Sequence, residues 1–314
     1  MRGHKVLFAT ILAATYFAAQ AMGAEKMVQV KGSDTLINLV QRLAEIYMAK
    51  NPGTAIAVTG GGSGTGIAAM VNGTCDIANS SRDMKTSEVE KAMSRGADPK
   101  RIVVAIDGLS IIVNASNPIK KLTVDQIGQI YRGEIADWSA LGGAKGPIAL
   151  YGRQSNSGTY DFMKEVVMKG EYSPKLKSMN GNAQIVEAIK QDVSGIGYVG
   201  VGYVKDVPGI TVLDVAKNPS MGYFSPLNNV DVKSGRYPIS RPLNQYVNGT
   251  PVGVVKGFIE FELSDEGQKT VESEGFFAIP EEYQNYNNLT LGRTYDSGEP
   301  QSNKVRSTEG TYAK

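Results

Sequence analysis

Apolar positions along the chain alternate between two spacings, which predicts strands and helices in alternation. A short apolar strand is expected over Met27–Lys31, and apolar residues then recur every three or four positions from Leu36 to Tyr47, the period of an amphipathic helix. The same succession returns with a strand over Ile56–Thr59 and a short helix that ends at Asn72-Gly73. Strands that alternate with helices in this way are typical of α/β sheets with mixed strand direction.

The rest of the chain continues the pattern. Further strands are expected over Asp76–Asn79, Ile102–Asn114 with a break at Asp107-Gly108, Ile148–Tyr151, Gly195–Tyr203, Ile210–Val215, and Tyr237–Val247 with breaks at Pro238 and Pro242. Further helices are expected over Ser87–Ser94, Thr123–Tyr131, the segment that ends at Gly170, Asn182–Asp192, Val252–Glu262 and Asp265–Glu274. Residues 291–314 are polar and lack apolar periodicity, which predicts a loose C-terminal tail.

The first 24 residues have the pattern of a secretory signal peptide. Arg2, His4 and Lys5 precede an apolar run over Val6–Ala19, and small residues follow, so cleavage is expected after Ala21 or Ala24. A membrane anchor is the alternative, but the run is short for a span. No lipobox cysteine follows. The pattern predicts a soluble protein that is exported to the periplasm.

Loss of this leader changes which functions the composition allows. The formal net charge falls from +2 to 0, because the leader holds two of the 33 basic residues and none of the 31 acids, so charge gives no reason to expect nucleic-acid binding. The only histidine, His4, is removed, and Cys75 is the single cysteine. A Ser-His-Asp triad, a histidine zinc site and an internal disulfide are thereby excluded. We expect no cofactor, no metal and no catalytic residue, and a buried, inert Cys75 thiol.

Polar and glycine-rich segments lie at four places where a predicted strand gives way to a helix. Their side chains and backbone N–H groups are donors for an anion, and ligands of α/β sheets collect at this edge. The triplet Ser-Gly-Thr occurs twice, which suggests two halves of one oxyanion site; helix N-caps are the alternative. The candidate residues are Ser33, Thr35, Ser63, Ser81, Arg82, Arg153, Ser157, Gly158 and Thr159.

Enzymatic alternatives have weaker support in the sequence. The loop Gly60–Gly66 lacks the Gly-Lys-Ser/Thr of a P-loop. A relaxed dinucleotide fingerprint is present at Gly64-x-Gly66-x-x-Ala69, with Asp83 at a suitable distance, but an exported protein has little access to NAD. No serine has an evident base, so a secreted phosphatase is a remote alternative that turnover of a phosphate ester would revive.

These four segments resemble the corresponding segments of a known protein family. Gly32–Thr35, the Gly60–Gly66 loop, Asp76–Arg82 and Arg153–Thr159 are similar to the periplasmic phosphate-binding proteins of high-affinity phosphate ABC transporters. The resemblance spans roughly residues 27–285. It implies a type II periplasmic-binding-protein fold: two α/β domains with mixed sheets flanked by helices, and the ligand in the interdomain cleft. Domain I would comprise residues 25–110 plus 236–290, and domain II residues 111–235.

The resemblance also implies a ligand set and partners. Inorganic phosphate would be the ligand, membrane-embedded ABC permease subunits the partners, and the protein a monomer. Ser33 is added to the implied set on local position alone. The family contacts fall on Thr35, the N–H of Leu36, Ser63, Arg153, Ser157, the N–H of Gly158 and Thr159.

The sequence departs from the family at two carboxylates. Ser81, followed by Arg82, stands where the family has the aspartate that accepts the phosphate proton, and Ser155 stands where it has the arginine's acidic partner. We therefore predict that Arg82 adds charge to the site, that Asp34 accepts the ligand proton, and that Arg153 meets the ligand with its charge less neutralised. Sulfate, arsenate and molybdate are the alternative ligands.

Overall fold

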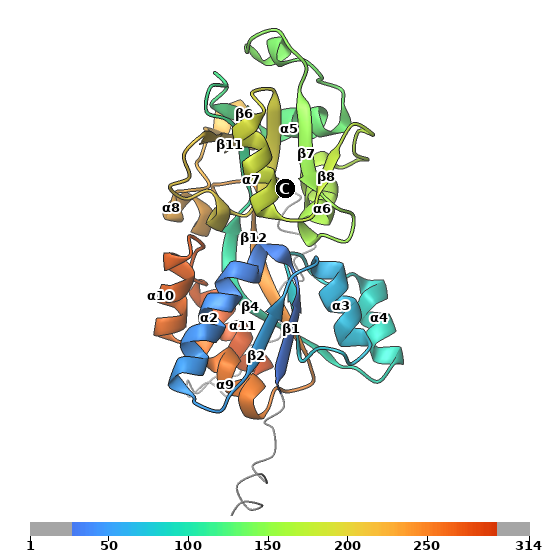
Figure 1. Ribbon diagram of the computed structural model, residues 1–314, viewed down its shortest axis with the longest axis vertical. Coiled ribbons are helices and arrows are strands. Elements are labelled where there is room, and N and C mark those ends of the chain that lie inside the picture. The colour runs from blue at the N-terminus through green and yellow to red at the C-terminus, as the bar shows by residue number, and fades with distance from the viewer. Residues whose placement is uncertain (1–26, 294–314) are drawn as a thin grey trace, which may run out of the picture.

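Two lobes, each built on a five-stranded sheet, form the part of the chain that the structure describes, residues 27–293 of a computed structural model (Figure 1). The predicted leader, and the predicted tail beyond Arg293, lie outside the described residues. Helices cover the faces of both sheets, as expected for strands that are buried on both sides.

The first sheet has the order β2-β1-β3-β12-β4. Strands β1, β2 and β3 run parallel, and β12 returns from far along the chain to pair antiparallel with both β3 and β4. The strands are β1 (Val28–Gly32), β2 (Ile56–Thr59), β3 (Ile77–Ser80), β4 (Pro99–Gly108) and β12 (Ser240–Asn248). The helices of this lobe are α2 (Ile37–Lys50), α3 (Ser63–Val71), α4 (Thr86–Ser94), α9 (Gly253–Glu262), α10 (Asp265–Ser273) and α11 (Glu281–Thr290).

The second sheet has the order β10-β5-β9-β7-β8, and β6 and β11 form a small sheet of their own. The strands are β5 (Ser110–Asn114), β6 (Lys121–Thr123), β7 (Ala149–Arg153), β8 (Lys177–Met179), β9 (Gly195–Val199), β10 (Ile210–Val212) and β11 (Asp214–Ala216). The helices are α5 (Val124–Arg132), α6 (Gly158–Phe162), which continues as a π-helix over Met163–Met168, α7 (Asn182–Gln191) and α8 (Asn229–Lys233).

Local sequence accounts for where these elements begin and end. Thr123 accepts a hydrogen bond from the Gln126 N–H and starts α5 as a capping box, and Gly133 ends it in the left-handed conformation. The apolar stripe of α2 buries Leu39, Val40 and Leu43 completely; burial of each such side chain stabilises the fold by about 1.5–3 kcal/mol.

Some predicted elements differ from those observed. The strand expected over Gly195–Tyr203 ends at Val199 in a short turn, and the one expected over Ile210–Val215 is two strands with different partners. Helix α11 was not predicted. It packs on the core through Tyr283, Tyr286 and the adjoining Leu291, and the side chain of Asn287 exchanges two hydrogen bonds with the backbone of Val103. Pro242 does not break β12. At this position β12 pairs only with β4, so the missing N–H of proline removes no hydrogen bond to β3.

Two adjacent segments join the lobes and form the hinge. One is the short connection between β4 and β5, and the other is the stretch that leads into β12. They are tied together where they cross: the Leu109 N–H donates to the Ile239 carbonyl at 3.1 Å, and Arg241 lies opposite Asp107 in the ladder. The hinge is therefore a narrow two-stranded ribbon.

One buried carboxyl in the first lobe leads to a prediction about pH and stability. Glu262 is fully buried, the Gln245 amide donates to it at 3.0 Å, and burial raises its pKa to about 8. The folded protein therefore holds a proton between about pH 4.5 and 8 that the unfolded chain has released, so this contribution to stability is complete below pH 4.5 and is lost as the pH rises through 8.

Glu262→Gln should accordingly leave the free energy of unfolding nearly unchanged at pH 5 and raise it by about 2 kcal/mol or more at pH 9. Urea unfolding at the two pH values measures this difference. Glu90→Gln, a change at an exposed position of α4, is the control and should affect neither value. An equal effect of Glu262→Gln at both pH values would contradict the prediction.

Candidate functional site

The loops that follow β1, β2 and β3 meet at one edge of the first sheet. Gly32, with φ of +138°, packs so closely that a Cβ would lie 2.2 Å from the Asn79 carbonyl oxygen. The turn brings Ser33 to Ser81, whose Oγ accepts its hydroxyl proton at 3.0 Å. The Ser81 N–H in turn donates to the Ser63 Oγ at 3.1 Å. Although Ser33 precedes a helical turn, its hydroxyl caps nothing and is directed into this cluster.

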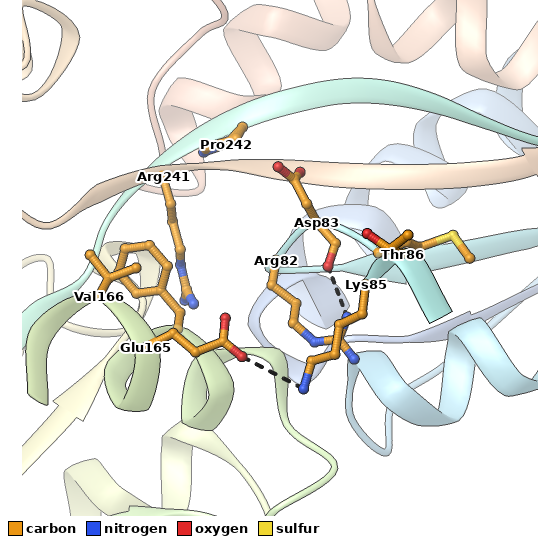
Figure 2. Close-up of a pocket in the computed structure, with 10 residues that line it drawn as sticks. Arg82, Asp83, Lys85, Thr86, Glu165, Val166, Arg241 and Pro242 are labelled. Atoms are coloured by element: carbon orange, nitrogen blue, oxygen red, sulfur yellow. Dashed lines mark hydrogen bonds and ion pairs between the residues drawn. The ribbon is translucent and has the colours of Figure 1, made fainter. Parts of the chain in front are cut away.

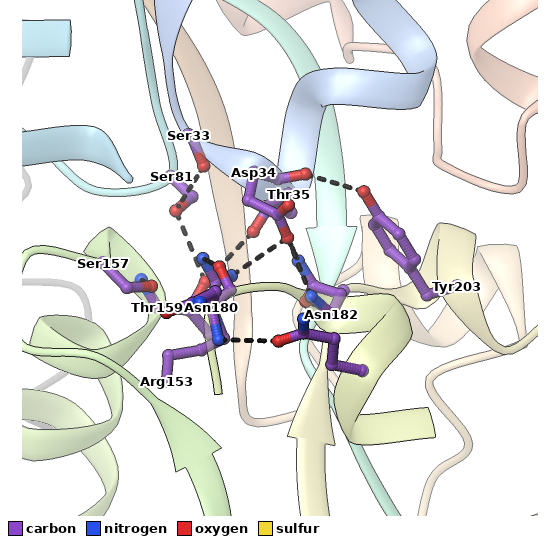
Figure 3. Close-up of polar contacts among 12 residues, drawn as sticks. Ser33, Asp34, Thr35, Ser81, Arg153, Ser157, Thr159, Asn180, Asn182 and Tyr203 are labelled. Atoms are coloured by element: carbon purple, nitrogen blue, oxygen red, sulfur yellow. Dashed lines mark hydrogen bonds and ion pairs between the residues drawn. The ribbon is translucent and has the colours of Figure 1, made fainter. Parts of the chain in front are cut away.

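The second lobe supplies the opposite half from the loop between β7 and α6. Ser157 caps α6, and its Oγ accepts from the Thr159 N–H at 3.2 Å. The Thr159 hydroxyl lies 3.1 Å from that of Thr35 and 3.4 Å from that of Ser81 (Figure 3). Hydroxyl groups from both lobes therefore converge at one point, and all five of these side chains are nearly or completely buried. They are Ser33, Thr35, Ser63, Ser81 and Thr159.

Arg153 is almost completely buried beside this cluster. Its Nη2 donates to the Asn180 carbonyl at 3.0 Å and its Nε to the Gln154 side chain at 3.2 Å. Its Nη1 lies 3.3 Å from Asp34 Oδ1 but makes no hydrogen bond to any described residue. Burial is the main influence on the pKa of Arg153 and lowers it from the usual value, while the Asp34 charge opposes this; the side chain remains a cation at any physiological pH.

Asp34 corrects one of our predictions. The charge of Arg153 is not left without a partner, because Asp34 of the first lobe supplies the carboxylate that is missing at Ser155. The backbone and side-chain N–H groups of Asn182 also donate to Asp34 Oδ1, and Tyr203 donates to its carbonyl at 2.7 Å. Asp34 thus links the two lobes. That Asp34 accepts the ligand proton stays a prediction. Its Oδ2 would be the accepting atom, because Oδ1 already accepts from Asn182.

Arg82 does not supply an uncompensated charge. Its guanidinium forms ion pairs with Glu88 at 2.7 Å and with Asp161 of the other lobe at 2.9 Å. It lines a cavity of ≈ 270 Å³ whose wall also includes Lys85 and Glu165 (Figure 2). Two acids therefore balance the charge that we expected to reach the ligand. Lys85 lies 3.2 Å from Asp161, so this group of ion pairs joins the lobes beside the hydroxyl cluster.

The second arginine of the site is Arg241, which the sequence analysis did not select. Its Nε and Nη2 donate to Asp107 Oδ2 at 3.0 and 2.8 Å, and Nη2 also donates to the Thr159 hydroxyl at 3.0 Å. Its buried Nη1 has no hydrogen-bond partner among the described residues. Asp107 directly follows the apolar run Ile102–Ile106, and a charge in such a place was an available signal. Arg241 gave no such signal, because its strand also contains the polar residues Asn244 and Gln245.

The two predicted backbone donors are the N–H groups of Leu36 and Gly158. The Leu36 N–H donates to the Ser33 carbonyl at 3.2 Å, so its role as a ligand stays a prediction. Gly158 begins α6 at the point where the lobes meet, and a Cβ there would lie 2.3 Å from the Ser63 Oγ. The backbone of α6 therefore approaches the first lobe in a way that only glycine permits.

The fold and this two-lobed site define a class of protein, the PBP superfamily: its domain model matches residues 18–266. Within that class the chain belongs to the phosphate-binding protein family. It is 33% identical over 279 residues to the phosphate-binding protein PstS of Pseudomonas aeruginosa, a match that covers 83% of this chain and 85% of the relative. It is 30% identical to PstS of Staphylococcus haemolyticus, with 80% of each chain covered.

Solved structures agree with this assignment. A phosphate ABC transporter substrate-binding protein with bound phosphate from Clostridium perfringens superposes with a TM-score of 0.73 at 28% identity, over 81% of this chain and 100% of the other. An ABC-type phosphate transport receptor from Vibrio cholerae gives a TM-score of 0.65 at 27% identity, with the same coverage. The predicted type II periplasmic-binding-protein fold is confirmed.

Residues 27–293 contain neither a candidate membrane span nor a candidate metal-binding group. No helix in this range has the length and apolar character that crossing a membrane requires. No three His, Cys, Asp or Glu side chains in the same range are grouped so that they could hold a metal ion.

Proposed function

We propose that this protein captures inorganic phosphate between its two lobes and delivers it to an ABC permease. One observation carries the proposal: hydroxyls from both lobes converge in a buried cluster with two arginines, each of which keeps an Nη1 atom without a hydrogen-bond partner among the described residues. The names of the relatives and the phosphate bound in the Clostridium perfringens protein support the same ligand.

The donor set suits a dehydrated tetrahedral anion. Hydroxyls and N–H groups donate to anionic oxygens through charge-assisted hydrogen bonds, which are about twice as strong as neutral ones. Closure of the lobes removes water and strengthens each of these bonds. The net charge of the two arginines is balanced by Asp34 and Asp107, so directed hydrogen bonds, rather than excess positive charge, would hold the ligand.

The wider role follows from the family and from the predicted leader. We infer a binding protein without enzymatic turnover, exported to the periplasm by the leader over residues 1–24, that meets the permease as a monomer. We also infer that residues 25–110 plus 236–290 form one domain and residues 111–235 the other. The return of β12 to the first sheet supports this division.

Calorimetric titration of unfolded and refolded, ligand-free protein tests the ligand. Phosphate should bind with a Kd of about 1 μM or tighter, and sulfate should fail to compete between pH 5 and 9. Equal binding of the two anions would show that the serine at position 81 removes the selectivity for phosphate. Absence of phosphate binding would overturn the proposal.

A further inference from the structure

Arg241 occupies an unusual place, because it belongs to the hinge as well as to the site. It is the second residue of β12, directly opposite Asp107 in the ladder, and the next pair, Ser240 and Gly108, is the last before the strands cross to the second lobe. Side chains at this point can contact both lobes. The Asp107–Arg241 ion pair is almost completely buried there.

Both members of the pair reach across to the second lobe. Asp107 Oδ1 accepts from the Val201 N–H at 2.8 Å, and Arg241 Nη2 donates to the Thr159 hydroxyl at 3.0 Å. The Arg241 guanidinium lies over the ring of Phe162, 5.1 Å from its centre. Contacts on three sides therefore fix the orientation of the guanidinium.

The remaining nitrogen of Arg241 requires an acceptor. Nη1 is buried and has no hydrogen-bond partner among the described residues, although Nη2 of the same planar group is already bonded to the hydroxyl cluster. Buried N–H groups of a cation are rarely left unpaired. The Arg241 charge also contributes to lowering the pKa of Arg153, so the two guanidinium groups are close enough to interact. An anion between them would satisfy both.

We propose that Arg241 is a second arginine ligand of the bound anion, held in place by Asp107, so that the anion contacts the hinge strand itself. This inference rests on the proposed function, because it takes phosphate as the anion. Arg241 would then supply a charged donor to the anion, whereas Ser81 supplies only a neutral hydroxyl. Ligand binding would be coupled to closure at the hinge, since Thr159 and Val201, which contact this pair, belong to the second lobe.

A double substitution tests this with little disturbance of the fold. Arg241→Gln alone would leave Asp107 buried without its cation, whereas Arg241→Gln with Asp107→Asn keeps polar groups of similar shape and no net charge. The double variant should bind phosphate at least tenfold more weakly than the wild type, with an unchanged Tm in the absence of ligand. Arg101→Gln with Asp83→Asn removes another Arg–Asp pair, at the other end of β4, and should bind normally.

Wild-type binding in the same titrations separates the two proposals. If the wild type binds phosphate and the double variant binds it within twofold of the wild type, Arg241 serves only the hinge and this inference fails. If the wild type does not bind phosphate, the proposed function fails and this inference with it.

Arginine signals of the wild-type protein test the same contact without relying on the fold of the double variant. In protein labelled with ¹⁵N-arginine, phosphate should shift the side-chain signals of two buried arginines, and only one of these two should be lost in Arg153→Lys protein. A shift of the Arg153 signal alone would overturn the inference.

Discussion

Replacement of Arg153 by methionine is expected to raise the Kd for phosphate about a thousandfold. The substitution removes a buried cation that stands beside the hydroxyl cluster, and each hydrogen bond to a charged group contributes about 1.5–3 kcal/mol. It also leaves Asp34 without its cation and close to the anion. Loss of two such hydrogen bonds corresponds to about 4 kcal/mol, which is a factor of a thousand in Kd.

Calorimetric titration with phosphate measures this change, and two further variants interpret it. Arg42→Met removes the same charge from an exposed position on α2 and should leave the Kd unchanged, which separates the local contact from the overall charge. Arg153→Met with Asp34→Asn should recover about tenfold of the loss, because the unpaired carboxylate no longer repels the ligand. A Kd for Arg153→Met within tenfold of the wild type would contradict the assignment of Arg153.

Gly158→Ala is expected to weaken phosphate binding at least a hundredfold by preventing closure. The added Cβ would lie 2.3 Å from the Ser63 Oγ and 2.8 Å from the Ser81 Oγ, both on the opposite lobe. These side chains are short and fully buried, so neither can move aside. The Tm without ligand should stay near that of the wild type, because alanine favours a helix and the clash arises only across the cleft.

Small-angle scattering provides an independent measure of closure. At saturating phosphate the wild type should become more compact than its ligand-free form, and Gly158→Ala should not. Gly146→Ala is the matched control, since a Cβ at that position meets no atom within 4 Å. Compaction of Gly158→Ala equal to that of the wild type would show that the lobes do not need to approach as closely as this structure has them.

The structure compensates for only one of the two positions, Ser155 and Ser81, at which the sequence has serine in place of the family's aspartate. Asp34, which is separate from Ser155 in sequence and on the other lobe, restores a partner to Arg153. At the third strand, Ser81 remains a neutral hydroxyl in contact with Ser33, Ser63 and Thr159. The site therefore has a carboxylate beside Arg153 but a neutral residue at position 81, and this makes selectivity between phosphate and sulfate the most informative property to measure.

Much of the fold, and the loops that carry most of the site's hydroxyls, could be predicted from the sequence alone. Apolar periodicity, glycine-rich loops and helix caps depend on neighbouring residues, so β1 to α3 and the Arg153–Thr159 loop were located within a few positions of where they lie. Helix α11 was missed because most of its residues are polar, and its few apolar residues and Asn287 become informative only where they meet the core and the backbone of Val103.

The pairing of charges was decided only by the tertiary structure. Arg82 lies just after β3 and Arg241 near the start of β12, and their neighbours in sequence do not tell which of them Glu88 and Asp161 neutralise and which reaches Thr159. Asp34 and Arg153 meet where the two lobes are in contact, and Asp107 and Arg241 meet through the return of the chain to the first sheet. Charge interactions depend on distance in space, so the sequence determined which donors the site could use, and the fold determined which of them face the ligand.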